Sequence, residues 1–167
     1  MDVRLANRDD IPALVRLINA AYRVEDFFIQ GDRTTERDIQ ARLEAPHAAF
    51  LVIDGPAPGG LAGAVYVEIR GHRGYFGLLS VDPVRQGQGL GRALVHAAEA
   101  HCRAAGCQAL DIDVVNLRRE LPAFYARFGF SPTGTTPFPA PDKLRQAAHL
   151  VLMTKPLAKG KRAPDGQ

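Results

Sequence analysis

The sequence has few of the features that mark membrane-embedded, secreted or disulfide-bonded proteins. No uninterrupted apolar run approaches the roughly 18 residues that a membrane span needs, and the first four residues, MDVR, lack the basic-then-apolar start of a signal peptide. Cysteine is scarce: Cys102 and Cys107 lie five positions apart in one expected helix and its cap, without other ligand clusters that could complete a zinc site. We therefore expect a cytoplasmic protein with both thiols reduced and no bound metal.

Net charge is also small, and it is unevenly placed. The chain has 21 Lys and Arg residues against 18 Asp and Glu residues, a formal charge of +3. From residue 155 to the end, four basic residues face one acidic residue, so this stretch carries the whole excess. The neutral remainder has no interleaved basic and aromatic residues, which disfavours nucleic-acid binding. With 46% hydrophobic residues, we expect one folded domain over residues 1–157 and a basic, disordered tail over 158–167.

Hydrophobic periodicity predicts a mixed α/β fold in the order β-α-α-β-β-β-α-β-α-β-β. Period-2 alternation and turn residues predict strands over residues 3–5, 48–53, 61–69, 75–81, 110–115, 130–136 and 148–154. Helical spacing of apolar residues predicts helices over about 11–21, 34–44, 90–105 and 119–128. The three strands between 48 and 81 should form an antiparallel meander, and the segment 137–146, which has three prolines, should be a loop.

Three glycines occupy alternate positions where the fourth expected strand gives way to a helix: Gly87, Gly89 and Gly91. Glycines at such a junction leave backbone N–H groups uncrowded at the positive end of the helix dipole, which suits a pyrophosphate. The dinucleotide fingerprint G-x-G-x-x-G is incomplete because Arg92 replaces its third glycine, although Asp111 lies about twenty residues on, as that fingerprint expects. No Gly-Lys-Ser or Gly-Lys-Thr occurs, which excludes a P-loop.

Read as Q-x-x-G-x-G, with Gln86, Gly89 and Gly91 on the pattern, the loop resembles motif A of the GNAT superfamily of acyl-coenzyme A dependent N-acyltransferases. The preceding LSVDP matches that motif's usual surroundings, and the downstream FYARFGF, residues 124–130, resembles motif B. The resemblance covers the element order from residue 3 to about 156. It implies a GNAT-like α/β (α+β) fold with a mixed, mostly antiparallel seven-stranded sheet and four helices.

One spacing departs from the family's usual pattern. Members often place fewer residues between the Asn at the end of the strand and the Tyr of motif B, whereas here Asn116 and Tyr125 are nine apart, with Pro122 between them. Proline is comfortable only in the first turn of a helix. We therefore expect the helix to start near Arg119, after a longer loop.

The resemblance implies acetyl-coenzyme A as the co-substrate and assigns roles to individual residues. The thioester is expected in a cleft where two parallel strands, 75–81 and 110–115, splay apart, with the Val81 N–H polarising the acyl carbonyl. Tyr125 is the implied proton donor to the leaving thiolate. The candidate bases for the amine are Glu68 and Asp113, beside Asp111. The expected cofactor-binding residues are Leu79, Ser80, Val81, Gln86, Gly87, Gln88, Gly89, Leu90, Gly91, Arg92 and Asn116.

The acceptor site should come from the segment after the first helix and from the late loop. The expected substrate-binding residues are Tyr22, Glu25, Phe27 and Phe28, with Phe138 on the opposite side and Arg118 and Arg119 as candidates for a substrate carboxylate. The sequence thus favours an N-acetyltransferase acting on a primary amine, with a non-catalytic acyl-coenzyme A binding or sensing module as the alternative. A small molecule, an amino acid, a drug and a protein N-terminus all stay open as acceptors, and a homodimer is possible.

Overall fold

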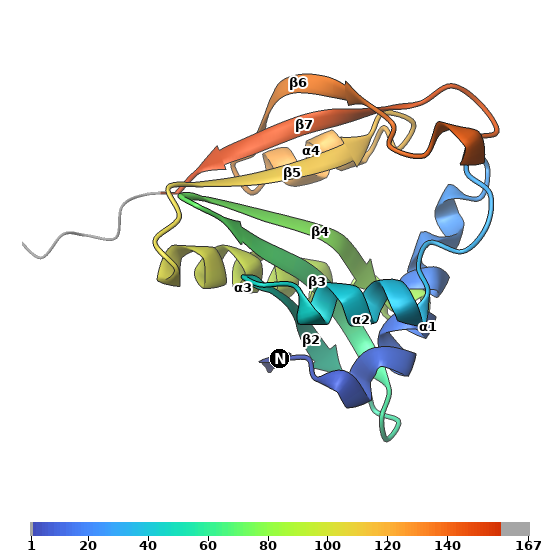
Figure 1. The fold of residues 1–167 in the computed structure, drawn as a ribbon, viewed down its shortest axis with the longest axis vertical. Coiled ribbons are helices and arrows are strands. Elements are labelled where there is room, and N and C mark those ends of the chain that lie inside the picture. Colours follow the sequence, from blue (N-terminus) through green and yellow to red (C-terminus); the bar gives the residue numbers. More distant parts are fainter. Residues whose placement is uncertain (1, 158–167) are drawn as a thin grey trace, which may run out of the picture.

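A seven-stranded mixed sheet forms the centre of the chain, in a computed structural model that describes residues 2–157 (Figure 1). The strands are β1 (Val3–Leu5), β2 (Ala48–Asp54), β3 (Leu61–Arg70), β4 (Arg73–Val81), β5 (Ala109–Val115), β6 (Ser131–Pro137) and β7 (His149–Pro156). The helices are α1 (Ile11–Tyr22), α2 (Glu36–Glu44), α3 (Leu90–Ala104) and α4 (Leu121–Ala126). Short 3-10 turns are η1 (Arg8–Asp10), η2 (Arg23–Glu25), η3 (Pro83–Arg85) and η4 (Pro141–Lys143). The predicted order is confirmed, and the expected tail, 158–167, lies outside the described residues.

The strands lie in the order β1-β2-β3-β4-β5-β7-β6. Every neighbouring pair is antiparallel except β4 and β5, so the predicted meander of β2, β3 and β4 is confirmed. The expected class, a mixed and mostly antiparallel α/β fold, is the observed one. The single parallel pair divides the sheet into a β1-β2-β3-β4 part and a β5-β7-β6 part.

Apolar side chains are buried on both faces of this sheet. Helix α3 buries Leu94 and Cys102 in a cluster that includes Phe76 of β4. On the other face, α1 and α2 bury Ile18 and Ile39. Each fully buried side chain of this size contributes about 1.5–3 kcal/mol relative to an exposed one, so the helices hold the sheet in place from both sides. Among residues 2–157, no helix is long and apolar enough to cross a bilayer.

Two helix starts explain how local sequence sets the boundaries. Helix α2 begins after Thr35, whose side-chain oxygen accepts a hydrogen bond from the Asp38 N–H at 3.2 Å, as expected of a cap residue. Helix α4 begins at Leu121 rather than near Arg119, so the loop before it is longer than predicted. Pro122 takes the second helical position, where its missing N–H removes no helical hydrogen bond.

The loop after β6 is tied to the segment after α1. Most of residues 137–146 is irregular, as predicted, apart from the turn η4. The Gln30 N–H donates to the Lys143 carbonyl at 2.9 Å, and the Arg145 N–H donates to the Phe28 carbonyl at 2.7 Å. Figure 1 shows these two segments meeting at the end of the molecule where β5 has moved away from β4. They close the open end of the divided sheet.

Candidate active site

Strands β4 and β5 separate soon after they meet. Their parallel pairing covers only three residue pairs, from Arg73 with Ala109 to Tyr75 with Asp111. Beyond Tyr75 the strands diverge, as the expected splay requires, and a cavity of about 1420 Å³ lies between the two parts of the sheet. Its wall includes residues of β4, the glycine loop, β5, α4 and the segment after α1.

A bulge in β4 turns the backbone at this point. Leu78 has a positive φ of 52°, and the pairing of β3 with β4 shifts register between Ala64 and Tyr66. Past the bulge, the Asp82 N–H donates to the Ala62 carbonyl at 2.9 Å. Since successive residues of an antiparallel strand point their N–H groups to opposite edges, the Val81 N–H points away from β3. It is directed to the side on which β4 has left β5.

The glycine loop forms one end of the cavity. Gly87 and Gly89 have φ values of +81° and +80°, and Gly89 is the residue that caps the start of α3. A residue with a Cβ atom would be strained at such φ values, so the backbone conformation requires glycine at these two positions. A Cβ atom at Gly91 would lie 3.9 Å from the Phe124 and Val81 side chains. The backbone is therefore exposed to the cavity without crowding, which fits a bound phosphate group.

The expected cofactor residues divide into two groups. Those that line the cavity are Leu79, Val81, Gln86, Gly87, Gly89, Leu90, Gly91 and Arg92. Ser80, Gln88 and Asn116 are outside its wall. Ser80 is buried and donates to the Leu78 carbonyl at 2.9 Å, and the Asn116 side-chain oxygen accepts from the His149 N–H at 2.8 Å. Asn116 thus joins the end of β5 to the start of β7.

Arg85 adds a donor beside the glycine loop. Its Nε is buried and has no hydrogen-bond partner among the described residues, and it lies 3.6 Å from the Asp82 carboxylate. A buried donor without a hydrogen bond is costly, and an anionic group in the adjoining cavity would accept one from it. The residues present therefore fit a pyrophosphate at this end. Within residues 2–157, no group of three or more His, Cys, Asp or Glu side chains could hold a metal ion.

Tyr125 lies on the cavity wall in α4 and is 7% exposed. Its ring packs against Phe124, Phe76 and Phe130, with ring centroids 5.0 to 6.0 Å apart. Burial raises the pKa of Tyr125 well above its usual range. The phenol therefore keeps its proton at neutral pH, as a proton donor must.

Asp113 of β5 is the candidate base that lines the cavity. The Tyr75 hydroxyl donates to its carboxylate at 3.3 Å, and burial raises the pKa of Asp113 above its usual range. Asp111 is outside the wall and accepts two hydrogen bonds from Arg73, at 2.6 and 2.7 Å. Glu68 is also outside it, and a hydrogen bond from Arg70 at 2.8 Å lowers its pKa.

The expected acceptor residues are also divided. Tyr22, Glu25 and Phe138 line the cavity, whereas Phe27 and Phe28 do not. Phe28 is fully buried with its ring centroid 4.8 Å from that of Phe27, which is 54% exposed. These two rings pack against each other rather than forming the wall.

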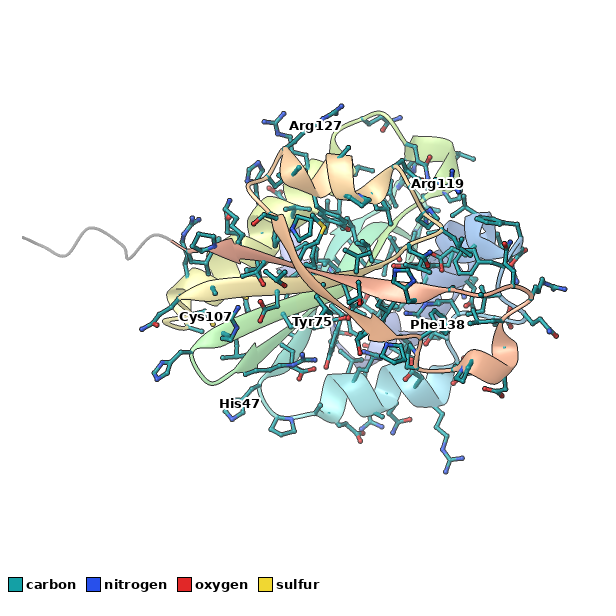
Figure 2. The ribbon with its side chains drawn as sticks, turned by 90° about the horizontal axis from the view of Figure 1, so that it is seen from above. His47, Tyr75, Cys107, Arg119, Arg127 and Phe138 are labelled. Atoms are coloured by element: carbon teal, nitrogen blue, oxygen red, sulfur yellow. The ribbon has the colours of Figure 1, made fainter. Side chains whose placement is uncertain are left out.

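The two arginines considered for a substrate carboxylate have different surroundings. Arg118 donates to Glu25 at 3.0 Å and to Glu120 at 2.6 Å, so its charge is neutralised within the protein. Burial raises the pKa of Glu25, and the Arg118 charge opposes that shift. Arg119 is exposed and outside the cavity wall. Figure 2 shows Arg119 and Arg127 near opposite ends of α4.

Sequence reasoning missed several residues of this wall, among them Arg85, Tyr75 and Arg33. Tyr75 pairs with Asp111 across the parallel junction, and alternation places Asp113 on the same face of the sheet. Figure 2 shows Tyr75 over the middle of the sheet. That alternation could have indicated Tyr75. Arg33 comes from an irregular segment far from Asp113 in the chain, and no local pattern indicates its position.

Comparison with known proteins identifies relatives of this chain and structures with the same fold. Residues 11–130 match the model of the Acetyltransferase (GNAT) family. The chain is 32% identical over 141 residues to the mycothiol acetyltransferase of Propionibacterium freudenreichii subsp. shermanii. The aligned segment covers 81% of this chain and 44% of that protein. It therefore spans less than half the length of this relative.

Solved structures share the fold at low sequence identity. The ribosomal-protein-S18-alanine N-acetyltransferase from Escherichia coli superposes with a TM-score of 0.76 at 17% identity, covering 97% of each chain. The structure of yncA from Salmonella typhimurium, determined with its cofactor acetyl-CoA, gives a TM-score of 0.73 at 19% identity, covering 96% of each chain. At this level of identity, the likeness establishes the fold alone.

Proposed function

The chain belongs to the GNAT acetyltransferase family, and from that premise we propose that it transfers an acetyl group from acetyl-coenzyme A to a primary amine. The amine attacks directly, while both substrates are bound. One observation carries the proposal: a single cavity extends from the glycine loop, past the separated ends of β4 and β5, to Tyr125 and Asp113. A phosphate cradle, a free backbone donor, an acid and a base therefore face the same space.

The cofactor end is made mainly of backbone groups. The N–H groups between residues 86 and 92 bind the pyrophosphate at the start of α3, and the nearby Arg85 and Arg92 side chains add positive charge. The separated edge of β4, from Leu79 to Val81, pairs with the pantetheine arm. Acetyl-coenzyme A supplies the acetyl group and a thiolate leaving group. The Val81 N–H donates to the acyl oxygen as that oxygen gains negative charge.

Two side chains move the protons. Asp113 accepts a proton from the amine nitrogen, and its raised pKa makes it a stronger base than an exposed aspartate. As the bond from carbon to nitrogen forms and the bond from carbon to sulfur breaks, Tyr125 gives its hydroxyl proton to the leaving sulfur. The expected residues Glu68 and Asn116 contribute indirectly in this scheme, since each is engaged outside the cavity wall.

The test is a mass-spectrometric screen of primary amines with acetyl-coenzyme A, with release of free thiol as an independent readout. We expect N-acetylated product and an equal amount of free thiol with at least one amine. Tyr125→Phe should bind acetyl-coenzyme A as tightly as the wild type and turn over about 10²- to 10⁴-fold more slowly. Tight binding of acetyl-coenzyme A without thiol release for any amine would contradict the proposal and favour a sensing module.

A further inference from the structure

The charged side chains at the acceptor end of the cavity are not all paired. Arg23 pairs with Asp32, Arg42 lies 3.3 Å from Asp38, and Arg118 lies 3.0 Å from Glu25. Arg33 lines the same cavity, and no carboxylate of residues 2–157 lies within 4.0 Å of its guanidinium. The acceptor end therefore contains a cation that forms no ion pair with a carboxylate of the described chain, although its charge opposes the rise in pKa that burial causes at Glu25 and Asp113.

Arg33 is held in position although it is exposed. Its guanidinium carbon lies 5.2 Å from the centroid of the Tyr22 ring, a cation–π contact with another residue of the wall. The backbone beside it is attached to α1, because the Thr34 N–H donates to the Asn19 side chain at 2.9 Å and that side chain donates back to the Thr34 carbonyl at 3.1 Å. A stacked guanidinium keeps the N–H groups along its edge available for an anion.

Asp113 presents the opposite case. Its carboxylate accepts a hydrogen bond from Tyr75, and no Lys, Arg or His nitrogen of the described chain lies within 4.0 Å of it. Among the described residues of the wall, Asp113 is thus the carboxylate without a cation within 4.0 Å, whereas the cations without such a carboxylate are Arg33, Arg92, Arg127 and Lys143. Ile29, Phe138 and Leu150 also line it, which gives the acceptor end an apolar surface.

From this arrangement, and resting on the function proposed above, we propose that the acceptor is a zwitterionic amino acid with an apolar side chain. Arg33 binds its carboxylate, and Asp113 receives its ammonium group and takes one proton from it, which leaves the neutral amine that attacks the acetyl carbon. A carboxylate would satisfy the guanidinium through a charge-assisted pair of hydrogen bonds. An amine without an anionic group would leave the exposed Arg33 guanidinium to water and would gain no ion pair there.

Lys143 is the closest rival for this role. It lines the cavity at the turn η4, is exposed, and has no carboxylate within 4.0 Å among the residues that the structure describes. A lysine ammonium is a compact, strongly hydrated charge on a flexible stem, and within residues 2–157 that of Lys143 forms no ion pair that would hold it over the cavity. The stacked and anchored Arg33 is the better carboxylate ligand.

The experiment compares three matched probes with acetyl-coenzyme A: L-phenylalanine, L-phenylalaninamide and 2-phenylethylamine, with the corresponding L-leucine series as a second set. In the wild type, the amino acid should have a kcat/KM at least about 10-fold higher than its amide or its decarboxylated amine. Arg33→Gln should lower kcat/KM for the amino acid by about 10- to 100-fold and leave the other two within about 2-fold. Arg33→Lys should fall between the wild type and Arg33→Gln.

Two further variants act as controls. Arg37→Gln removes an exposed arginine of α2 that is outside the cavity wall, and it should change none of the three probes. Lys143→Gln should affect the amino acid less than Arg33→Gln does. Binding of L-phenylalanine by calorimetry, in the presence of coenzyme A, should weaken in Arg33→Gln by the same factor as kcat/KM.

The outcomes separate this inference from the function on which it rests. If amines are acetylated but the amino acid has no advantage, or if Arg33→Gln affects all three probes equally, the zwitterion is wrong and the acetyltransferase stands. If Lys143→Gln alone removes the advantage, the assignment to Arg33 is overturned. If no amine is acetylated but L-phenylalanine binds in an Arg33-dependent manner, the binding site is supported and the proposed function fails.

Discussion

Gly74 occupies the point where the two parts of the sheet join. It pairs with Ile69 of β3 on one side and with Leu110 of β5 on the other, and Cys102 of α3 covers it. A Cβ atom at Gly74 would lie 2.5 Å from the Cys102 Sγ, 2.9 Å from the Cys102 Cβ and 3.3 Å from a methyl carbon of Leu110. Ordinary contacts of this kind are 3.4–4 Å. Gly74→Ala therefore forces α3 and the sheet apart, or forces Cys102 into another rotamer.

The size of the effect follows from the burial of Cys102, which is fully inaccessible to solvent. Overpacking a core costs about 1–3 kcal/mol, and we expect Gly74→Ala at the upper end, about 3 kcal/mol, because both Cys102 atoms are overlapped. For a chain of this size, each kcal/mol lowers Tm by about 2–4 °C. The expected fall is therefore about 6–12 °C. Gly134→Ala on the edge strand β6 is the matched control, since its Cβ would meet nothing within 4 Å, and it should change stability by less than about 0.5 kcal/mol.

Thermal and urea unfolding followed by circular dichroism measure both variants. A double-mutant cycle with Cys102→Ala removes the sulfur that the new methyl group would overlap, so Gly74→Ala should cost less in that background by about 1 kcal/mol or more. Equal stabilities for Gly74→Ala and Gly134→Ala would refute the packing argument. So would additive effects of Gly74→Ala and Cys102→Ala, since they would place the strain elsewhere than at this contact.

Three further changes test the site and its supports. Asp113→Asn should lower kcat/KM by about 10²- to 10⁴-fold. Because the pKa of Asp113 is raised, kcat/KM of the wild type should increase as the pH rises through a value above the usual aspartate range. The pH profile of the variant should lack this increase. Gly87→Ala imposes a side chain at a φ of +81° and should weaken acetyl-coenzyme A binding several-fold by calorimetry, whereas Gly134→Ala should not. Hydrogen bonds from Arg4 lower the pKa of Asp10 below 3.8. The contact therefore stabilises the fold at a pH above the pKa of Asp10 in the unfolded chain, and this stabilisation is lost as the pH falls through the lower pKa of the folded state. Acid unfolding of Arg4→Gln, followed by circular dichroism, should begin at a higher pH than that of the wild type.

Local sequence patterns were sufficient to predict the fold because nearly every element carries its own signal. Strand β4 alternates buried and partly exposed residues over its length, so period 2 is visible in the sequence. Helix α3 begins at the end of the glycine loop and is followed by Gly106, whose φ is +85°. The start of α4 was predicted two residues too early. There, Pro122 allows a helix to begin at any of several preceding residues, and the N–H of Leu121 instead bonds to the carbonyl of Arg118.

The sequence signal is stronger at the glycine-loop end of the cavity than at the other end, and the reason is physical. Binding of a pyrophosphate by backbone N–H groups requires glycines at close spacing in one loop, so the requirement appears as a local motif. A proton donor in a short aromatic helix is similarly local. The charged residues proposed to bind the acceptor come from separate segments of the cavity wall, since Arg33 precedes α2, Asp113 lies on β5 and Lys143 on η4. Their proximity depends on the tertiary fold, and no short pattern in the sequence encodes it.

A sheet that divides after three parallel pairs also needs contacts to hold its open end at a definite width. Here irregular segments supply them: Ile29 bridges to Leu144, and Glu25 pairs with Arg118, 93 residues away. Both partners of that ion pair are largely buried, and loss of Arg118 would leave the Glu25 carboxylate without its partner, at a cost of about 3–5 kcal/mol. The glycine loop belongs to neither segment. Contacts between segments that are distant in the sequence therefore hold this end of the cavity, whereas the geometry of the other end comes from the glycine loop.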